Sequence, residues 1–237
     1  MRIGTCGMPV SWSKYTDELP VMEVQKTFYS PMNIKTAERW RKRVPPNFEF
    51  TLKAPQAITH PPSSPTYRRY KGHMGDFGYF KLNEDTKKAW SNFVKIAKVL
   101  NAKVVVFQSP PSFRENEENL ERIEYFFSAI DREFVFGWEP RGTWEEKTVM
   151  NICKKLELIH VVDPFKNRST YGPFKYYRLH GIGGYRYSYS FEDLKLLAGW
   201  VNEGDYVMFN NTDMWKNALD FKKIIENQIE TFKSATS

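Results

Sequence analysis

Glu139, Asp163 and His180 are three side chains that can transfer protons or bind metal ions, and each ends a short apolar run. Two carboxylates and an imidazole suit a divalent metal such as Mn²⁺ or Zn²⁺. Without a metal, the same trio can act as general acids and bases. No close-spaced motif such as His-x-x-x-His accompanies them, and Arg141 and Arg178 would compete with a metal cation. The sequence therefore favours a metal-free catalytic trio over a metal site, with a purely structural ion-pair network as the alternative.

A second set of residues could bind an anion. Arg178 and His180 are followed by the glycine-rich run that starts at Gly181, and Asn210 and Asn211 end a later apolar run. Glycines let backbone N–H groups approach an anion closely, arginine offers a two-pronged donor, and asparagine offers amide donors. We expect this corner to bind a phosphate or a carboxylate; the alternative is a tight glycine turn.

Lys53, Gln108 and Arg141 complete the expected ligand-binding residues, because each stands at or just after the end of an apolar run. Lys53 would be a Schiff-base nucleophile if it were removed from water. An ion pair between Lys53 and Glu23 is the interpretation that we prefer, since a buried charge needs a partner. The cofactor is unknown.

These residues belong to a repeating pattern of apolar runs with polar ends. The runs span residues 3–5, 24–27, 48–53, 104–108, 134–139, 158–163, 176–180 and 206–210. Helical periodicity predicts helices over 33–43, 84–100, 116–131, 144–157, 190–202 and 214–233. Eight strands alternating with helices predict an α/β fold, a single TIM-type (β/α)8 barrel of residues 1–237, with its site at the C-terminal ends of the strands.

Two connections depart from the pattern. Residues 164–175 have no helical period, and residues 54–83 form a long loop after the third strand, which is a candidate lid. The long loop includes His60, which could swing over the barrel mouth, and the run Tyr67-Arg68-Arg69-Tyr70-Lys71. That run could contact nucleic acid, although we favour tyrosines packed on the barrel rim.

Alternation of side chains along the strands predicts a polar barrel interior. The helices must cover an apolar surface, so the polar set should face the barrel axis. This places Glu23, Gln25 and Thr27 inside on one strand. Inside positions on other strands are Thr51, Lys53, Glu139, Arg178 and His180.

The composition is that of a globular protein, with 41% hydrophobic and 27% charged residues among 237. The net charge of +7 comes from the first 83 residues, which contain 13 Lys and Arg against 6 Asp and Glu. Such a basic region favours an anionic partner, with nucleic acid as one candidate and a solvated face as the alternative. The two cysteines, the lack of a long apolar run and the lack of a signal-like start suggest a cytoplasmic protein without membrane contact.

Several motifs, in order, resemble the YecE-like proteins, the family called domain of unknown function seventy-two. They are Glu23–Tyr29, Trp40, Phe48–Lys53, Ile58–His60, Phe107–Phe113, Trp138–Arg141, Thr143–Trp144, Val162–Asp163, Arg178–Gly181, Phe209–Asn211 and Asn217–Ala218. The resemblance spans nearly the whole chain. It implies a TIM-barrel-like fold and supplies no activity, so whether the protein is an enzyme stays open.

The sequence best supports a barrel-mouth pocket that binds or transforms a small anionic ligand. One alternative is a nucleic-acid-binding or nucleic-acid-processing protein that uses the basic first third. The other is a non-catalytic ligand-binding or scaffold protein.

Overall fold

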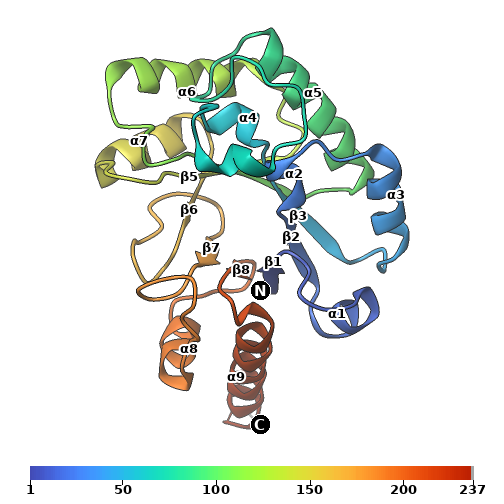
Figure 1. Cartoon of the computed structure of the whole chain (residues 1–237). Helices are drawn as coiled ribbons and strands as arrows, with labels where there is room; N and C mark the ends of the chain where they lie inside the picture. Colours follow the sequence, from blue (N-terminus) through green and yellow to red (C-terminus); the bar gives the residue numbers. More distant parts are fainter. Residues whose placement is uncertain (236–237) are drawn as a thin grey trace.

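A computed structural model describes residues 1–235, and its eight parallel strands form one closed barrel (Figure 1). Each strand pairs with the next along the chain, and the eighth pairs with the first. The strands are β1 (Arg2–Cys6), β2 (Val21–Val24), β3 (Glu49–Lys53), β4 (Val104–Gln108), β5 (Val135–Glu139), β6 (Ile159–Val162), β7 (Tyr176–Leu179) and β8 (Tyr206–Phe209). The predicted (β/α)8 fold is confirmed.

Helices surround the ring of strands on the outside (Figure 1). They are α1 (Trp12–Glu18), α2 (Lys26–Tyr29), α3 (Ile34–Lys42), α4 (Gln56–Thr59), the 3₁₀ helix η1 (Pro65–Arg69), α5 (Glu84–Val99), α6 (Glu117–Ala129), α7 (Glu146–Lys155), α8 (Phe191–Ala198) and α9 (Met214–Ala235). All six predicted helices are present, and in the described chain no helix connects β6 to β7, as expected. Within residues 1–235, no helix is long and apolar enough to cross a membrane.

The second strand lies earlier in the chain than predicted. Residues 21–24 pair with β3 and residues 21–23 also pair with β1, whereas Gln25 already has helical backbone angles, with φ −85° and ψ −24°. Thr27 lies in α2, where its hydroxyl donates to the carbonyl oxygens of Val24 at 3.1 Å and Lys53 at 2.8 Å. Alternation along a strand therefore does not apply to Thr27, and its expected place in the barrel interior was wrong.

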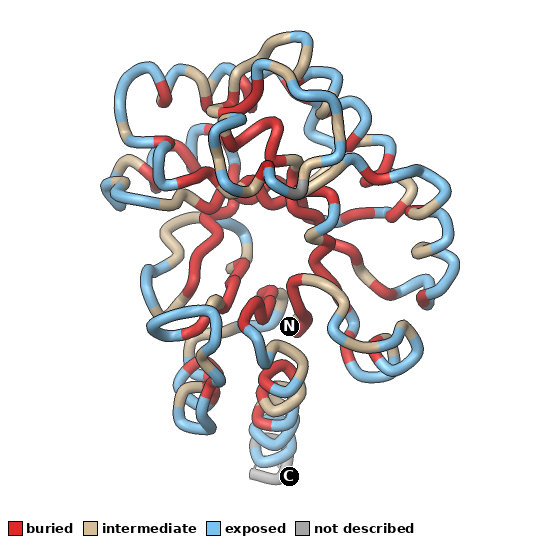
Figure 2. The backbone as a smooth tube through the Cα atoms, in the orientation of Figure 1, coloured by how far each residue is buried: buried red, intermediate tan, exposed pale blue. Residues whose placement is uncertain are grey.

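The barrel interior has an apolar layer and a polar layer. The apolar layer lies mainly in the N-terminal and middle parts of the strands, with Cys6 at the C-terminal end of β1; its other members are Val21, Val104, Val106, Ile159, Val161, Tyr176, Tyr206 and Met208. The polar layer lies toward the C-terminal ends and contains Glu23, Lys53, Gln108, Glu139 and Arg178. The buried strands form the red centre of Figure 2, with exposed helix faces around them. The charged groups that Arg178 joins are thus gathered beneath the mouth.

The long segment after β3 packs against the barrel. Backbone N–H groups of Gly78 and Phe80 donate to the carbonyl oxygens of Ala57 and Ile58, both at 2.9 Å. The fully buried ring of Phe80 contacts aromatic rings from β4, α6 and the loop after β4. Tyr67 packs against Tyr70 and Phe77, so its side chain belongs to a small core of this segment.

Candidate functional site at the barrel mouth

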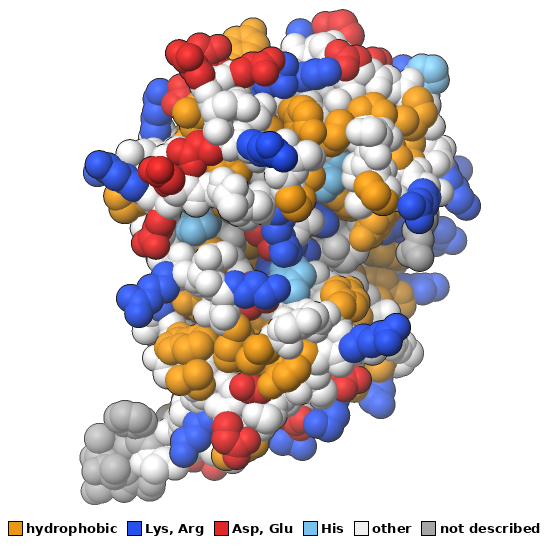
Figure 3. Space-filling view, turned by 60° about the vertical axis from the view of Figure 1, so that its left-hand side comes forward, with side chains coloured by type: hydrophobic (Ala, Val, Ile, Leu, Met, Phe, Trp, Pro, Cys, Tyr) orange, Lys and Arg blue, Asp and Glu red, His pale blue; other side chains and the backbone are white. Residues whose placement is uncertain are grey.

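An open hollow of about 530 Å³ lies at the C-terminal ends of the strands. Its lining comes from the ends of strands and from the loops that follow them. The lining residues are Cys6, Gln25, Tyr29, Lys53, His60, Gln108, Ser109, Pro110, Pro111, Arg141, His180, Tyr185 and Asn210. Figure 3 shows histidine side chains beside Lys and Arg side chains near the middle of one face of the molecule.

Arg178 lies below this hollow, with its guanidinium between two carboxylates. Its Nε and Nη2 donate to the two oxygens of Glu23, at 3.1 and 2.9 Å, and its Nη1 donates to Glu139. Glu23 also accepts from the hydroxyl of Tyr176 at 2.9 Å and from the side-chain amide of Gln25. Arg178 and Glu23 are fully buried. The guanidinium of Arg178 therefore binds only side chains of the barrel interior and does not line the hollow.

The expected pair of Glu23 with Lys53 was wrong. Lys53 Nζ instead donates to Gln108 Oε1 at 2.7 Å and lies 3.6 Å from the centre of the Phe28 ring. Gln108 in turn donates through Nε2 to Glu139 at 2.9 Å. A bidentate guanidinium satisfies the Glu23 carboxylate better than a single ammonium, which explains why Arg178 occupies this position.

Glu139 joins the interior network to the hollow. It accepts from Arg141 Nη2 at 2.7 Å, in addition to Arg178 and Gln108. Burial alone raises the pKa of Glu139, but the positive charges of Arg178 and Arg141 outweigh burial and hold it well below its usual range. Glu139 is therefore an ionised carboxylate that orients three donors, and it faces a neighbouring crevice instead of lining the hollow.

His180 is the member of the predicted trio that lines the hollow. Its Nε2 is 2.7 Å from Arg141 Nη2, and its Nδ1 is 3.6 Å from Asp163. Asp163 accepts from the backbone N–H groups of Phe165 and His180, both at 3.1 Å. Burial lowers the pKa of His180. A neutral ring whose Nε2 accepts from Arg141 fits this geometry.

The hollow is lined by basic side chains without a carboxylate among them in the described chain. Lys53, Arg141, His60 and His180 line it, and no Asp or Glu does so in the part of the chain that the structure describes. The carboxylates that balance these groups lie behind or below them. An anion at the mouth would therefore meet donors directly and carboxylates only at greater distance.

The pKa values of Lys53 and His60 are both strongly altered by their surroundings. Burial and the nearby charge of Arg178 lower the pKa of Lys53 from 10.5 to about 7. In the described chain, no carboxylate forms an ion pair with it. Burial and the charge of Lys53 also lower the pKa of His60 to about 3, so this ring is neutral at pH 7.

Backbone N–H groups of the glycine turn after β7 donate to acceptors within the protein. The N–H of Gly181 donates to the hydroxyl of Tyr189 at 2.8 Å, and the N–H of Gly184 donates to the carbonyl of Gly181 at 3.3 Å. The amide of Asn211 is fully buried and donates to Tyr187 and Asn217. Asn210 alone among the two asparagines lines the hollow, where its Oδ1 lies 3.3 Å from the hydroxyl of Tyr185.

Five of the ten predicted site residues line the hollow, namely Lys53, Gln108, Arg141, His180 and Asn210, and the structure adds others that the sequence argument did not assign to a ligand. Tyr29 and Tyr185 each add a hydroxyl, and Gln25 adds an amide. Tyr29 and Gln25 lie within the motif at residues 23–29, so that motif could have indicated them; Tyr185 follows no strand directly and carried no such signal. Within residues 1–235, no three His, Cys, Asp or Glu side chains form a group that could hold a metal ion.

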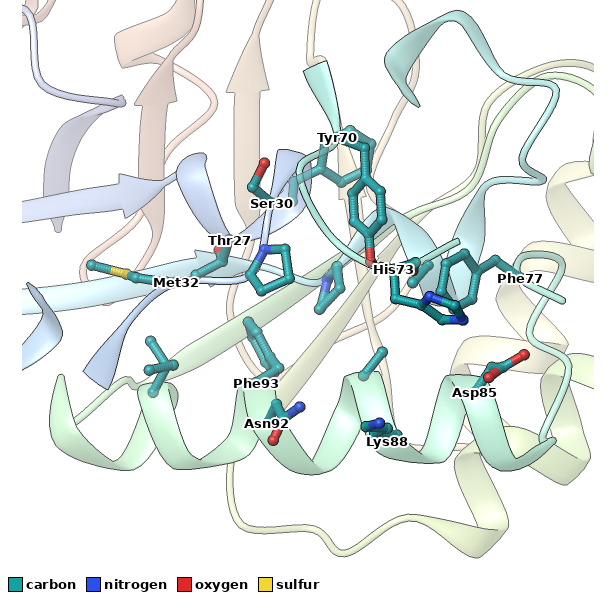
Figure 4. Close-up of a pocket in the computed structure, with 16 residues that line it drawn as sticks. Thr27, Ser30, Met32, Tyr70, His73, Phe77, Asp85, Lys88, Asn92 and Phe93 are labelled. Carbon is teal, nitrogen blue, oxygen red and sulfur yellow. Dashed lines mark hydrogen bonds between the residues drawn. The ribbon is translucent and has the colours of Figure 1, made fainter. Parts of the chain in front are cut away.

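A second hollow of about 180 Å³ lies between α5 and the long segment (Figure 4). Its labelled side chains include Phe77 and Phe93, with Lys88, Asn92 and Asp85 along the helix. This lining is mostly apolar, and none of the three predicted catalytic side chains lies in it. The barrel mouth, where Lys53, Arg141, His60 and His180 lie together, is therefore the candidate functional site.

The family model described as "Protein of unknown function DUF72" matches residues 10–236. The chain belongs to the DUF72 family. This match confirms the resemblance to YecE-like proteins. No curated protein matches this DUF72 chain.

Crystal structures of other proteins share the DUF72 chain's fold. Two structures of a DUF72 family protein from Enterococcus faecalis V583 have TM-scores of 0.75 and 0.74 at 18% and 20% identity; each covers 95% of this chain, with 95% and 97% of the other covered. Endonuclease IV from Thermus thermophilus has a TM-score of 0.55 at 10% identity, with 98% and 100% covered. A xylose isomerase domain-containing protein from Salmonella typhimurium LT2 has a TM-score of 0.57 at 13% identity, with 94% and 96% covered. At such low sequence identities, the similarity shows a shared barrel fold alone.

Proposed function

We propose that this DUF72 protein binds a small phosphate- or carboxylate-bearing ligand at the barrel mouth. The observation that carries the proposal is the basic lining of the hollow, where a lysine, an arginine and two imidazole side chains occur, in the described chain, without a carboxylate. Hydrogen bonds to a charged group are roughly twice as strong as neutral ones, so such a lining favours an anion.

Arg141 is the main anion-binding group in this proposal. Its side chain is 29% exposed, and its Nη2 is held by Glu139 at 2.7 Å and by His180 at 2.7 Å. These contacts fix the guanidinium at the edge of the hollow before a ligand arrives. A preorganised donor loses less side-chain entropy on binding than a mobile one.

The three predicted catalytic residues have different roles in this proposal. His180 touches the ligand and can exchange a proton with it, whereas Glu139 and Asp163 act through Arg141 and His180 as positioning residues. Lys53, Gln108 and the amide of Asn210 complete the donors and acceptors around the ligand.

Calorimetric titration with inorganic phosphate, and separately with malonate, tests the proposal. Arg141→Met should weaken binding by roughly tenfold or more, the loss expected for a charge-assisted hydrogen bond. Arg39→Met is the matched control, because Arg39 is exposed on α3 and lies outside the hollow. Absence of measurable binding of either anion at low salt, or equal binding by both variants, would contradict the proposal.

Nucleic-acid binding is the second candidate function, and the charge of the first 83 residues supports it. Helix α3 has Arg39, Arg41 and Lys42 in its last turn. A labelled oligonucleotide at low salt tests this candidate, since phosphate-backbone binding weakens steeply with added salt. A non-catalytic ligand-binding or scaffold role would instead show anion binding that Glu139→Gln and Asp163→Asn leave intact, with no chemical change in any bound ligand.

A further inference from the structure

We infer that Lys53 forms a covalent imine with a carbonyl group of the ligand, so that the ligand class is a small aldehyde or ketone that carries a phosphate or carboxylate. The inference rests on the proposed function, because the anionic group is what places the carbonyl beside Lys53. Arg141 is the main group that binds the anion, whereas Lys53 is the residue that reacts with the carbonyl.

The position of Lys53 is the first argument. It is the last residue of β3, it lines the hollow, and only 5% of its surface is exposed. Its Nζ donates to Gln108 Oε1 at 2.7 Å and lies 3.6 Å from the Phe28 ring centre. Gln108 is itself held by Glu139 at 2.9 Å. The amine is therefore fixed at the floor of an open hollow and is reachable from solvent.

The missing counter-ion is the second argument. The carboxylates nearest in the network, Glu23 and Glu139, are occupied by Arg178, and in the described chain neither forms an ion pair with Lys53. A purely structural lysine in a polar barrel would be expected to pair with one of them. Lys53 is instead supported by a neutral amide and an aromatic ring, which tolerate an uncharged amine.

The electrostatic surroundings agree with this geometry. The groups that act on Lys53 are Arg178, Glu139, Glu23 and Cys6, and His60 lines the same hollow and contacts the same Phe28 ring. Burial and Arg178 lower the pKa of Lys53 to about 7, so a large fraction of the amine is neutral at neutral pH. A neutral amine in a desolvated site is the form that attacks carbonyl groups.

The reaction balances without a redox partner. The lone pair of Nζ forms a bond to the carbonyl carbon, and the carbonyl oxygen takes up the proton that nitrogen releases, which gives a carbinolamine. The carbon–oxygen bond then breaks, one water molecule leaves, and a carbon–nitrogen double bond remains. His60 and His180, both lining the hollow with lowered pKa values, can carry the proton between nitrogen and oxygen.

Reductive trapping tests the inference. The protein is incubated with pyridoxal phosphate, which carries both an aldehyde and a phosphate, then reduced with sodium borohydride and mapped by peptide mass spectrometry. Pyridoxal, which lacks the phosphate, is the matched probe. We expect labelling of Lys53 to exceed that of exposed lysines such as Lys42 by roughly tenfold, and to fall by a similar factor with pyridoxal or with excess inorganic phosphate. Lys53→Arg should abolish this label, whereas Lys42→Met should leave it unchanged.

The outcomes separate the two proposals. Phosphate binding that depends on Arg141, together with no preferential label on Lys53 in the unmodified protein, would overturn the imine and leave the anion site standing. Preferential labelling of Lys53 that is equal with pyridoxal and insensitive to phosphate would contradict the anion site and the ligand class inferred from it. Mapping the label in the unmodified protein keeps the test decisive even where a Lys53 variant fails to fold.

Discussion

Arg178 and Glu23 form a two-pronged ion pair across the inside of the barrel, with Nη2–Oε1 at 2.9 Å and Nε–Oε2 at 3.1 Å. The residues come from β7 and β2, which are not neighbours in the barrel, and both side chains have no exposed surface. This pair lies beneath the hollow, whose basic lining comes instead from Lys53, Arg141, His60 and His180.

Glu23→Gln should lower the free energy of unfolding by about 3 kcal/mol, because removing one member of a buried pair strands the other charge. Breaking a buried ion pair costs about 3–5 kcal/mol, and we expect the lower value because Arg178 keeps its contact with Glu139. Urea unfolding measures it. Asp220→Asn, in the exposed pair with Lys216, is the control and should change stability by less than about 0.5 kcal/mol. Equal effects of the two substitutions would contradict this assignment.

The stability advantage of Lys53→Met over the unmodified protein should shrink as the pH rises from 7 to 10. The pKa of Lys53 is about 7 when folded and 10.5 as its ordinary value, so between these the unfolded chain binds a proton that folded Lys53 has lost. Stability therefore rises with pH in this window, by about 1 kcal/mol per unit, and the Met variant lacks this contribution. Urea unfolding at both pH values measures the difference. Lys42→Met should show no such trend, and a difference independent of pH would argue against a lowered pKa.

Phe80→Ala should lower the free energy of unfolding by about 3–5 kcal/mol, since the ring is fully buried among four other aromatic rings. The same substitution should speed hydrogen exchange at the amides of Gly78 and Phe80 itself, which bond to α4. Tyr125→Ala is the control, because Tyr125 is 64% exposed. Fast exchange of these amides in the unmodified protein would show a loosely held segment instead.

Gly181→Ala should destabilise the protein by about 1–3 kcal/mol, because Gly181 has φ +90° and an added Cβ would lie 2.1 Å from the carbonyl oxygen of Gly184. Gly199→Ala, at φ −75° and with room for a Cβ, should change stability by less than about 1 kcal/mol. Thermal unfolding compares them. Since Gly181 donates to Tyr189, folded Gly181→Ala protein should still bind phosphate; loss of binding would bring the glycine turn back as the anion site.

Local sequence signals were sufficient for most of the fold. Apolar runs with polar ends marked all eight strands within a few residues, and helical spacing marked the six long helices. The short helices α1, α2 and α4 were missed, because four to seven residues carry too little periodicity to be distinguished from loops. The shift of β2 has the same origin, since Gln25 to Thr27 reads as a strand until the turn into α2 is known.

Alternation also predicted which strand residues face inward, and Thr51, Lys53, Glu139 and Arg178 all do so. It could not predict their partners. Glu23 and Lys53 lie on neighbouring strands, yet Glu23 pairs with Arg178, 155 positions away in the chain. The choice depends on side-chain length and on the width of the closed barrel, which no local pattern encodes.

The sequence by itself determined the barrel and most of the inward polar set, because these follow from periodicity along single strands. Only the tertiary structure decided that Arg178 forms ion pairs with two carboxylates and that Arg141 and His180 face the hollow. It also decided that Lys53 donates to the amide of Gln108 instead of to a carboxylate. Burial and pairing fix the charge of a side chain, and both arise from contacts between residues far apart in the chain.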